Sequence, residues 1–278
     1  MVSGSTPSMV SFPPCKINVG LNIISKRDDG YHNILTVFYP VPWHDILEII
    51  PSKKASFTVT GQPVPGSAKE NLCLQAYDIL KEDFKLVPVS IHLHKIIPMG
   101  AGLGGGSSDA AYTLRTLNEL FDLSLSHEAL RNYAARLGSD CAFFIEEKPV
   151  LGSGRGEVLT DIRISLKGKF LVIVKPEVQI STASAYANSS PGKPTVDLRT
   201  IMEKHAVNEW RGLLKNDFED NLFKQFPFIQ SIHQKLYATG AQYASLSGSG
   251  SSVFGIFEKA IDLRNRFEGL TYWSGYLN

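Results

Sequence analysis

A glycine-rich run at residues 98–111, PMGAGLGGGSSDAA, constrains the fold more than any other stretch of the chain. The alternating segment PVSIHLHKI before it predicts a strand. The segment SSDAAYTLRTLNEL after it predicts a helix, because Ala111, Leu114, Leu117 and Leu120 share one face. Unpaired N–H groups and partial positive charge gather at a helix N-terminus, and glycines let the backbone approach phosphate oxygens. The run therefore predicts a loop that wraps a polyphosphate.

Three other structures are common for a glycine-rich loop. A Walker A loop needs a lysine after its last glycine, but Ser107 follows Gly106 directly. A Rossmann fingerprint matches at Gly100, Gly102 and Gly105, but the chain then continues into a connector and another helix instead of a second strand. A glycine turn without a ligand is the third alternative. The polar residues that open the helix, Ser107, Ser108 and Asp109, favour phosphate binding.

Strict alternation in CKINVGLNIISK predicts a strand with two different faces. Lys16, Asn18, Gly20 and Asn22 share one face, where Gly20 leaves room for something bulky, while the opposite face is apolar. Taken alone, Lys16 fits a solvated strand face equally well. The turn DDG at 28–30 and a second strand at 34–41 follow.

The remaining pattern mixes strands and helices in both halves of the chain. Strands are expected at DILEII and SFTVTG, and helices near 71–83 and 126–138. From about 166 we expect the strand KFLVIVKP, helical segments over 181–239 interrupted by a loop at 189–195, the strands QYASLS and VFGIF, the helix KAIDLRNRF and the strand YWSGYL. This order predicts an α+β fold with domains at 1–165 and 166–278.

Composition narrows the classes of partner and the compartment. With 28 basic and 27 acidic residues, the net charge of +1 gives no electrostatic reason to expect nucleic acid or an anionic membrane. Three widely spaced cysteines, Cys15, Cys73 and Cys141, predict reduced thiols in a cytoplasmic protein. The start, MVSGSTPSMVSFPP, lacks the features of a signal peptide and is expected to be a flexible lead-in. Apolar runs such as FLVIV are too short to span a bilayer.

Three smaller features carry weaker expectations. His92 and His94 point the same way on a strand, and without a third ligand they predict a polar face and not a metal site. GSGRGE at 152–157 is expected to form a bend beside the active site. GSGSS at 248–252 is either a lining for a diphosphate or a tight connection between strands.

Three ordered motifs resemble those of the GHMP kinases, the group named for galactokinase and for homoserine, mevalonate and phosphomevalonate kinases. PPCKINVGLNI at 13–23 resembles the first motif, the glycine run the second, and SLSGSGSSVFGIF at 245–257 the third. The resemblance implies two α+β domains, the second ferredoxin-like, with the active site in the interdomain cleft. It also implies ATP and Mg²⁺ as cofactors.

Within the group, CKINVGL, DDGYHNILTVFYPV and LGSDCAFFI resemble a branch that phosphorylates a cytidine diphosphate-linked methylerythritol on its 2-hydroxyl, in the non-mevalonate route to isoprenoids. This small molecule is the expected partner of a monomer or homodimer. Two departures are mild: Cys15 stands where alanine is usual, and SDCAFF replaces the commoner ADVPFF.

The resemblance also implies roles for individual residues, with no set of protein metal ligands. Lys16 and Asp140 match the catalytic pair. The residues matching the acceptor site are Asn18, Tyr31, His32, Asp140, Thr182 and Tyr186. The residues matching the nucleotide site are Asn71, Leu72, Lys95, Pro98, Met99, Gly100, Ala101, Gly102, Leu103, Gly104, Gly105, Gly106, Ser107 and Ser108.

Overall fold

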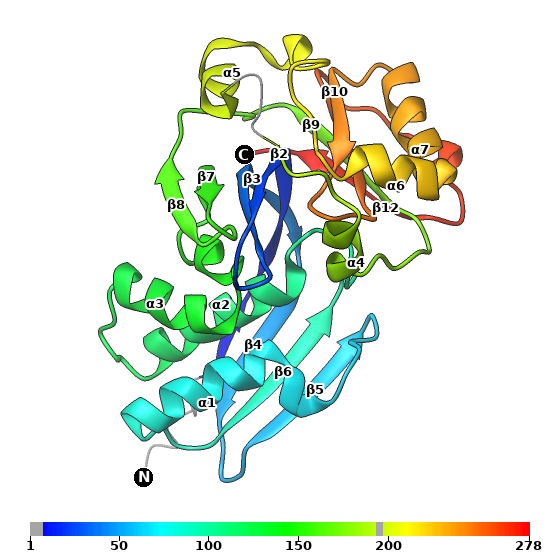
Figure 1. The fold of residues 1–278 in the computed structure, drawn as a ribbon. Coiled ribbons are helices and arrows are strands. Elements are labelled where there is room, and N and C mark those ends of the chain that lie inside the picture. The colour runs from blue at the N-terminus through cyan, green and yellow to red at the C-terminus, as the bar shows by residue number, and fades with distance from the viewer. Residues whose placement is uncertain (1–7, 193–196) are drawn as a thin grey trace. The chain divides into compact units, whose positions relative to one another are not determined.

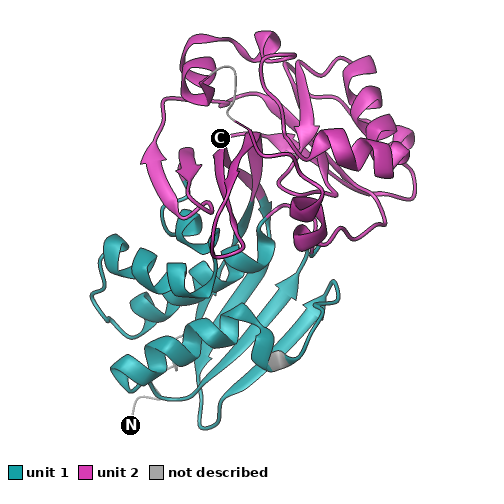
Figure 2. Ribbon diagram, in the orientation of Figure 1, with its two compact units in different colours: residues 1–15, 43–99, 104–147 teal, residues 16–42, 100–103, 148–278 magenta. Residues whose placement is uncertain are grey.

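The computed structural model describes residues 8–192 and 197–278, and the chain divides into two compact units (Figure 2). The first unit comprises Met1–Cys15, Trp43–Met99 and Gly104–Glu147. The second comprises Lys16–Pro42, Gly100–Leu103 and Lys148–Asn278. Neither unit is continuous in sequence, and the expected domain boundary between 165 and 166 stays a prediction.

The first unit contains a four-stranded sheet in the order β1-β4-β6-β5 (Figure 1). Its strands are β1 (Met9–Ser11), β4 (Ile46–Pro51), β5 (Ser56–Gly61) and β6 (Val89–Lys95). Strand β6 runs antiparallel to β4 and parallel to β5. Because β1 pairs with β4, the expectation of a flexible lead-in is wrong for Met9–Ser11. Residues 1–7 of that segment lie outside the described residues.

Three helices belong to the same unit, and local capping explains where two of them begin. They are α1 (Leu72–Phe84), α2 (Gly105–Leu120) and α3 (His127–Leu137), with the short helices η1 (Ala68–Glu70) and η2 (Cys141–Ile145). The Asn71 side chain caps α1, and Ser126 caps α3 by accepting a hydrogen bond from Ala129 N. Helix α2 follows the glycine run as predicted, and it begins within the run, at Gly105.

The second unit contains two sheets, of which the first has the order β2-β3-β7-β8. Its strands are β2 (Pro14–Lys26), β3 (His32–His44), β7 (Val150–Ser153) and β8 (Val158–Asp161). The predicted DDG turn joins β2 to β3, and the predicted GSGRGE bend joins β7 to β8. In a Rossmann unit, the strand after the helix would join the sheet that contains β6. The strand that follows α3 is β7, and it pairs with β3 of another sheet, so the glycine run does not belong to a Rossmann unit.

The other sheet has the order β10-β11-β9-β12, and its described pairings are antiparallel. Its strands are β9 (Phe170–Lys175), β10 (Tyr243–Leu246), β11 (Val253–Phe257) and β12 (Thr271–Tyr276). This order is the ferredoxin-like one that the family resemblance implies. Between β9 and β10 lie α4 (Thr182–Ala187), α5 (Leu198–Lys204), η3 (Val207–Glu209), α6 (Glu219–Gln225) and α7 (Pro227–Ala238).

The predicted helix KAIDLRNRF is wrong. Only the short helix η4 (Arg264–Arg266) forms there. Asp262 Oδ1 accepts a hydrogen bond from Arg264 N at 3.0 Å, and such a local turn competes with helical hydrogen bonding. Leu263 and Phe267 still bury their side chains in the core, which explains the helix-like spacing of apolar residues.

Candidate active site

The glycine run adopts backbone conformations that favour glycine over other residues. Gly100, Gly102 and Gly104 have φ angles of 62°, 75° and 71°, in the left-handed region. Gly104 is the N-cap of α2, and no side chain caps this helix in the part of the chain that the structure describes. The first N–H groups of a 16-residue helix therefore lack a side-chain acceptor, as an anion site requires.

Some of these glycines are also required by contacts inside the protein. A Cβ atom on Gly102 would lie 1.9 Å from the carbonyl oxygen of Ser247, and one on Gly105 would lie 2.9 Å from Nζ of Lys95. A Cβ on Gly100 would meet nothing within 4 Å. The interpretation of the run as phosphate-binding therefore explains only part of its glycine content.

The two serines after the glycines lie in the first turn of α2. Ser108 is fully buried, and its Oγ has no hydrogen-bond partner among the described residues. A buried hydroxyl without a partner is costly, so this oxygen suits a ligand such as a phosphate or a hydrated Mg²⁺. A hydrogen bond joins the Ser107 side chain to the thiol of Cys141.

Three predicted nucleotide residues lie elsewhere in the first unit. Asn71 Oδ1 accepts a hydrogen bond from Cys73 N at 2.9 Å, and Leu72 is the first residue of α1. The Lys95 ammonium is fully buried, 2.5 Å from Asp45 Oδ2 and 2.6 Å from Asp109 Oδ2. Contact between these residues and a nucleotide stays a prediction, and the Lys95 ammonium is already engaged by two carboxylates.

Lys16 is buried, which excludes the solvated strand face that its sequence pattern also allowed. Its side chain is 3% exposed and donates to Asn18 Oδ1 at 2.5 Å and to Gly102 O at 3.0 Å. Asn18 in turn donates to Thr36 Oγ1 at 3.0 Å. Lys16 and Asn18 are thus fixed beside the glycine run within the second unit. The room beside Gly20 is filled by Leu198, whose Cδ1 would lie 2.7 Å from a Cβ there.

Asp140 lies in the first unit, at the N-terminal end of the short helix η2. Its half-buried side chain follows Gly138, which ends α3 as the sequence predicted. The neighbouring Cys141 is fully buried, and burial raises the pKa of its thiol to about 12. Because Lys16 belongs to the second unit, the pairing of Lys16 with Asp140 stays a prediction.

The structure brings together the aromatic residues of the predicted acceptor site within the second unit. The rings of His32 and Tyr186 stack with centroids 4.8 Å apart and an interplanar angle of 15°. Burial, with a smaller contribution from the Lys26 charge, lowers the pKa of His32 and so favours a neutral imidazole. Tyr31 is 58% exposed, and the Arg155 guanidinium lies 5.0 Å from the centroid of its ring.

The GSGSS turn joins β10 to β11 and is held by the predicted acceptor residue Thr182 and by Asn216, which the sequence did not single out. Thr182 Oγ1 lies 3.1 Å from Ser249 Oγ. Asn216 is fully buried and donates to Leu246 O at 3.0 Å and to Gly248 O at 2.9 Å. Asn216 begins a polar run, NDFEDN at 216–221, inside the region where only helical segments were expected, so the sequence pattern gave no signal of this role.

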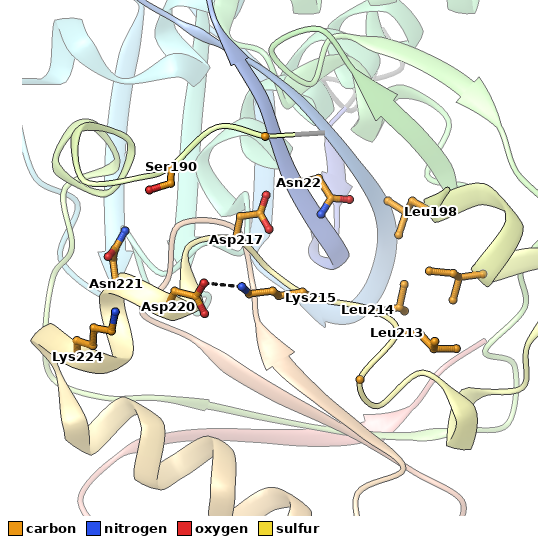
Figure 3. A pocket seen from close by; sticks show the side chains of 13 residues that line it. Asn22, Ser190, Leu198, Leu213, Leu214, Lys215, Asp217, Asp220, Asn221 and Lys224 are labelled. Carbon is orange, nitrogen blue, oxygen red and sulfur yellow. Dashed lines mark hydrogen bonds and ion pairs between the residues drawn. The ribbon is translucent and has the colours of Figure 1, made fainter. Parts of the chain in front are cut away.

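A polar pocket of about 440 Å³ lies within the second unit (Figure 3). Its lining includes Asn22, Asp217, Lys224 and the Lys215–Asp220 ion pair. Burial raises the pKa of Asp217, whose carboxylate accepts a hydrogen bond from Ile23 N at 2.8 Å. The predicted nucleotide and acceptor residues are not among those that line this pocket.

The described residues form neither a metal-binding group of side chains nor a helix that could cross a membrane. No group of three or more His, Cys, Asp or Glu side chains among them could bind a metal ion. Thr60 Oγ1 lies 2.9 Å from a ring nitrogen of each of His92 and His94, so these histidines form the polar strand face that was expected. Within 8–192 and 197–278, no helix is both long enough and apolar enough to span a bilayer.

Comparisons with known proteins identify the class to which this fold and these motifs belong. The GHMP kinases N terminal domain matches residues 71–148, and the GHMP kinases C terminal domain matches residues 197–269. A homoserine kinase from Cytophaga hutchinsonii has the same fold, with a TM-score of 0.69 at 15% identity over 99% of this chain and 95% of that one. The fold and its motifs are thus those of the GHMP kinases, a class of ATP-dependent kinases.

Proteins with higher sequence identity show which family within the GHMP kinases this chain belongs to. A relative from Bacteroides thetaiotaomicron is 51% identical over 90% of this chain and 92% of its own length, and one from Cytophaga hutchinsonii is 48% identical with the same coverage. Both are named 4-diphosphocytidyl-2-C-methyl-D-erythritol kinase. A crystal structure of a 4-(cytidine 5'-diphospho)-2C-methyl-D-erythritol kinase matches with a TM-score of 0.81 at 30% identity, over 96% of this chain and 98% of that one. The chain therefore belongs to the 4-diphosphocytidyl-2-C-methyl-D-erythritol kinase family.

Proposed function

We propose that this chain transfers the γ-phosphate of ATP to the 2-hydroxyl of 4-diphosphocytidyl-2-C-methyl-D-erythritol, in the non-mevalonate route to isoprenoid precursors. The observation that carries the proposal is the buried Lys16 ammonium, which donates to the Gly102 carbonyl of the glycine run. A buried cation that is fixed to that loop can stabilise the negative charge on the oxygens when a phosphoryl group passes from ATP to an alcohol.

In the proposed reaction, the acceptor oxygen forms a bond to the γ-phosphorus while the bond from that phosphorus to the ADP oxygen breaks. Asp140 accepts the hydroxyl proton, and Lys16 stabilises the negative charge that develops on the acceptor oxygen. A positioned general base contributes roughly 10²–10⁴-fold in rate. Phosphoryl transfer depends mostly on positioning and charge stabilisation, which a rigidly held lysine provides.

The nucleotide is proposed to bind at the start of α2. The uncapped N–H groups of Gly105 and Gly106 and the unpartnered hydroxyl of Ser108 support this assignment. Mg²⁺, when bound, would neutralise phosphate charge, and Ser108 is the residue proposed to hold it. One protein ligand suffices in principle, because Mg²⁺ keeps several waters and binds phosphate oxygens.

The cytidine end of the acceptor is proposed to bind at Tyr31, His32, Thr182 and Tyr186. The stacked rings of His32 and Tyr186 offer an aromatic surface for a pyrimidine. A neutral His32 has one ring nitrogen that donates and one that accepts, as recognition of a cytosine edge requires.

The test is a coupled assay of ADP release with the cytidylyl acceptor, ATP and Mg²⁺. We expect turnover with this acceptor and none with mevalonate or homoserine, which other members of the class phosphorylate. Folded protein that releases no ADP above the substrate-free blank would reject the proposal.

The proposed role of Asp140 gives the first mutational prediction. Asp140→Asn should retain ATP binding, because the charge lost is not on the nucleotide loop, while kcat falls roughly 10²–10⁴-fold. Calorimetric titration with an ATP analogue and the coupled assay measure the two effects separately. Asp122→Asn, which changes an exposed carboxylate of the same unit, is the control and should leave both unchanged. An unimpaired rate in Asp140→Asn would remove Asp140 from the base role.

The proposal also covers the compartment, the metal requirement and the oligomeric state of the enzyme. We propose a cytoplasmic enzyme, because its three buried cysteines form no disulfide, as is usual in a reducing compartment. A requirement for Mg²⁺ is tested by removing the ion with a chelator and restoring it. A monomer or homodimer is proposed, and sedimentation of the purified chain distinguishes the two.

A further inference from the structure

Three charged side chains of the first unit form a buried cluster next to Gly105, the first residue of α2. Lys95, the last residue of β6, places its ammonium 2.5 Å from Asp45 and 2.6 Å from Asp109. All three side chains are at most 3% exposed. We call Lys95, Asp45 and Asp109 the buried triad.

The triad connects the two ends of the segment that contains the glycines. Asp45 Oδ1 accepts hydrogen bonds from Ile96 N at 2.5 Å and Ile97 N at 2.8 Å, where the chain leaves β6. Asp109 is the fifth residue of α2 and directly follows Ser108. Lys95 bridges the two carboxylates, so the start of α2 is fixed to the end of β6.

The Lys95 ammonium also lies against the first residue of α2. A Cβ atom on Gly105 would be 2.9 Å from Lys95 Nζ and 3.1 Å from a methyl carbon of Ile97. The ammonium cannot move aside easily, because both carboxylates hold it. The absence of a side chain at Gly105 therefore lets the triad approach the helix N-terminus from within the protein.

The two carboxylates of the triad act on the charge of Lys95, and burial acts on the charge of Asp109. Burial alone lowers the pKa of Lys95, but the Asp109 and Asp45 carboxylates outweigh it and raise that pKa. Burial raises the pKa of Asp109, an effect that Lys95 opposes and Asp45 strengthens. Removing one member of a buried, hydrogen-bonded charge cluster is expected to have a larger effect than removing one member of an exposed ion pair.

We propose that the buried triad is a positioning device for the nucleotide, in which Asp109 holds the first turns of α2, with Ser108, at the place where the phosphates bind. The inference rests on the proposed function. Asp109 is a positioning residue, since its carboxylate acts through Lys95 and not on the nucleotide itself.

The test compares two substitutions at Asp109. Asp109→Leu removes the tether and leaves the Lys95–Asp45 pair intact, so we expect the Kd for a non-hydrolysable ATP analogue to rise about tenfold or more. Asp109→Asn retains an oxygen that accepts from Lys95, and its Kd should stay within about threefold of the wild-type value. Asp220→Leu breaks the exposed Lys215–Asp220 pair as a matched control and should leave the Kd unchanged.

Calorimetric titration measures nucleotide binding, and steady-state kinetics measure the two KM values. For Asp109→Leu we expect the KM for ATP to rise while the KM for the cytidylyl acceptor stays at the wild-type value. If this variant does not fold, Asp109→Ala, which adds no bulk, is measured in its place.

Two outcomes overturn the inference: folded Asp109→Leu that binds the analogue as tightly as wild type, or a KM for the acceptor that rises as much as the KM for ATP. Wild-type protein that binds the analogue but does not turn over the cytidylyl acceptor would reject the proposed function. The Kd values of the Asp109 variants would still test the positioning role of the triad. Wild-type protein that binds no analogue overturns both.

Discussion

The backbone of Ser247 lies where a side chain on Gly102 would begin, so this glycine is required by a neighbour that is 145 residues away in sequence. The Ser247 hydroxyl also donates to Gly102 O at 2.8 Å, and Lys16 donates to the same carbonyl. One carbonyl of the glycine run thus orients the proposed catalytic lysine. At the scale of single residues, a motif that reads as ligand binding also serves the packing of the protein itself.

Replacing Gly102 by alanine should therefore destabilise the protein more than replacing Gly100. Gly102→Ala combines a left-handed backbone with a Cβ 1.9 Å from a carbonyl oxygen, so we expect the free energy of unfolding to fall by about 2–4 kcal/mol. Gly100→Ala has a similar φ but open space, and should cost only about 1–2 kcal/mol. Urea unfolding followed by circular dichroism measures both values, and equal losses would contradict the steric argument.

The residues of the candidate site were predictable where a motif surrounds them and not where they are isolated in the sequence. Lys16, the glycine run and the His32–Tyr186 pair come from motifs with recognisable spacing. Asp45 was missed because it stands alone in sequence and acquires its role only by facing Lys95, 50 residues away. Such long-range pairing has no periodic signal along the chain.

At the scale of elements, Glu219 connects the start of α6 to β10. Its carboxylate accepts from Ser245 Oγ at 2.7 Å and from Leu246 N at 2.9 Å. Burial raises the pKa of Glu219 to about 7, although both hydrogen bonds and the Lys215 charge oppose this shift. The folded protein therefore binds this proton more tightly than the unfolded chain, whose glutamate titrates at the ordinary value.

The sign of the resulting pH dependence follows from linkage. The contribution of Glu219 to stability is fully present below the ordinary glutamate pKa and is lost as the pH rises through about 7. Between pH 4 and pH 8 the free energy of unfolding should fall by on the order of 3 kcal/mol from this group. Glu219→Gln should remove that part of the dependence.

Denaturant unfolding of both proteins at several pH values checks this prediction. The difference between variant and wild type at each pH cancels the other groups that titrate in the same range, such as His233, whose pKa burial lowers. A difference that does not change with pH would contradict a raised pKa at Glu219.

At the scale of the whole molecule, the three thiols report on global unfolding. Cys15, Cys73 and Cys141 form no disulfide and are at most 1% exposed, and burial raises the pKa of both Cys73 and Cys141. Since the thiolate is the reactive form, none of them should react with Ellman's reagent in the native protein at pH 8. All three should react in guanidinium chloride, and a thiol that reacts rapidly in native protein would contradict this packing.

The α+β class and nearly all strands longer than four residues could be predicted, because alternation and turn residues are local signals. The helix at KAIDLRNRF could not be excluded, because an Asp262 turn and a helix share the same apolar spacing. Two domains were expected, but which separate stretches make up each compact unit could not be predicted. That division depends on strand β3 pairing with β7, which is more than 100 residues away along the chain.

The composition of the second unit from three separate stretches has a consequence for its synthesis. The ribosome makes the hairpin at 16–42 long before strand β12, which must pair with β9, made about 100 residues earlier. At a translation rate of roughly 5–20 residues per second, the open edge of β9 waits several seconds for that partner. A nascent chain of this enzyme therefore carries an unpaired strand edge until β12 has been made, and an exposed edge of this kind is prone to aggregation.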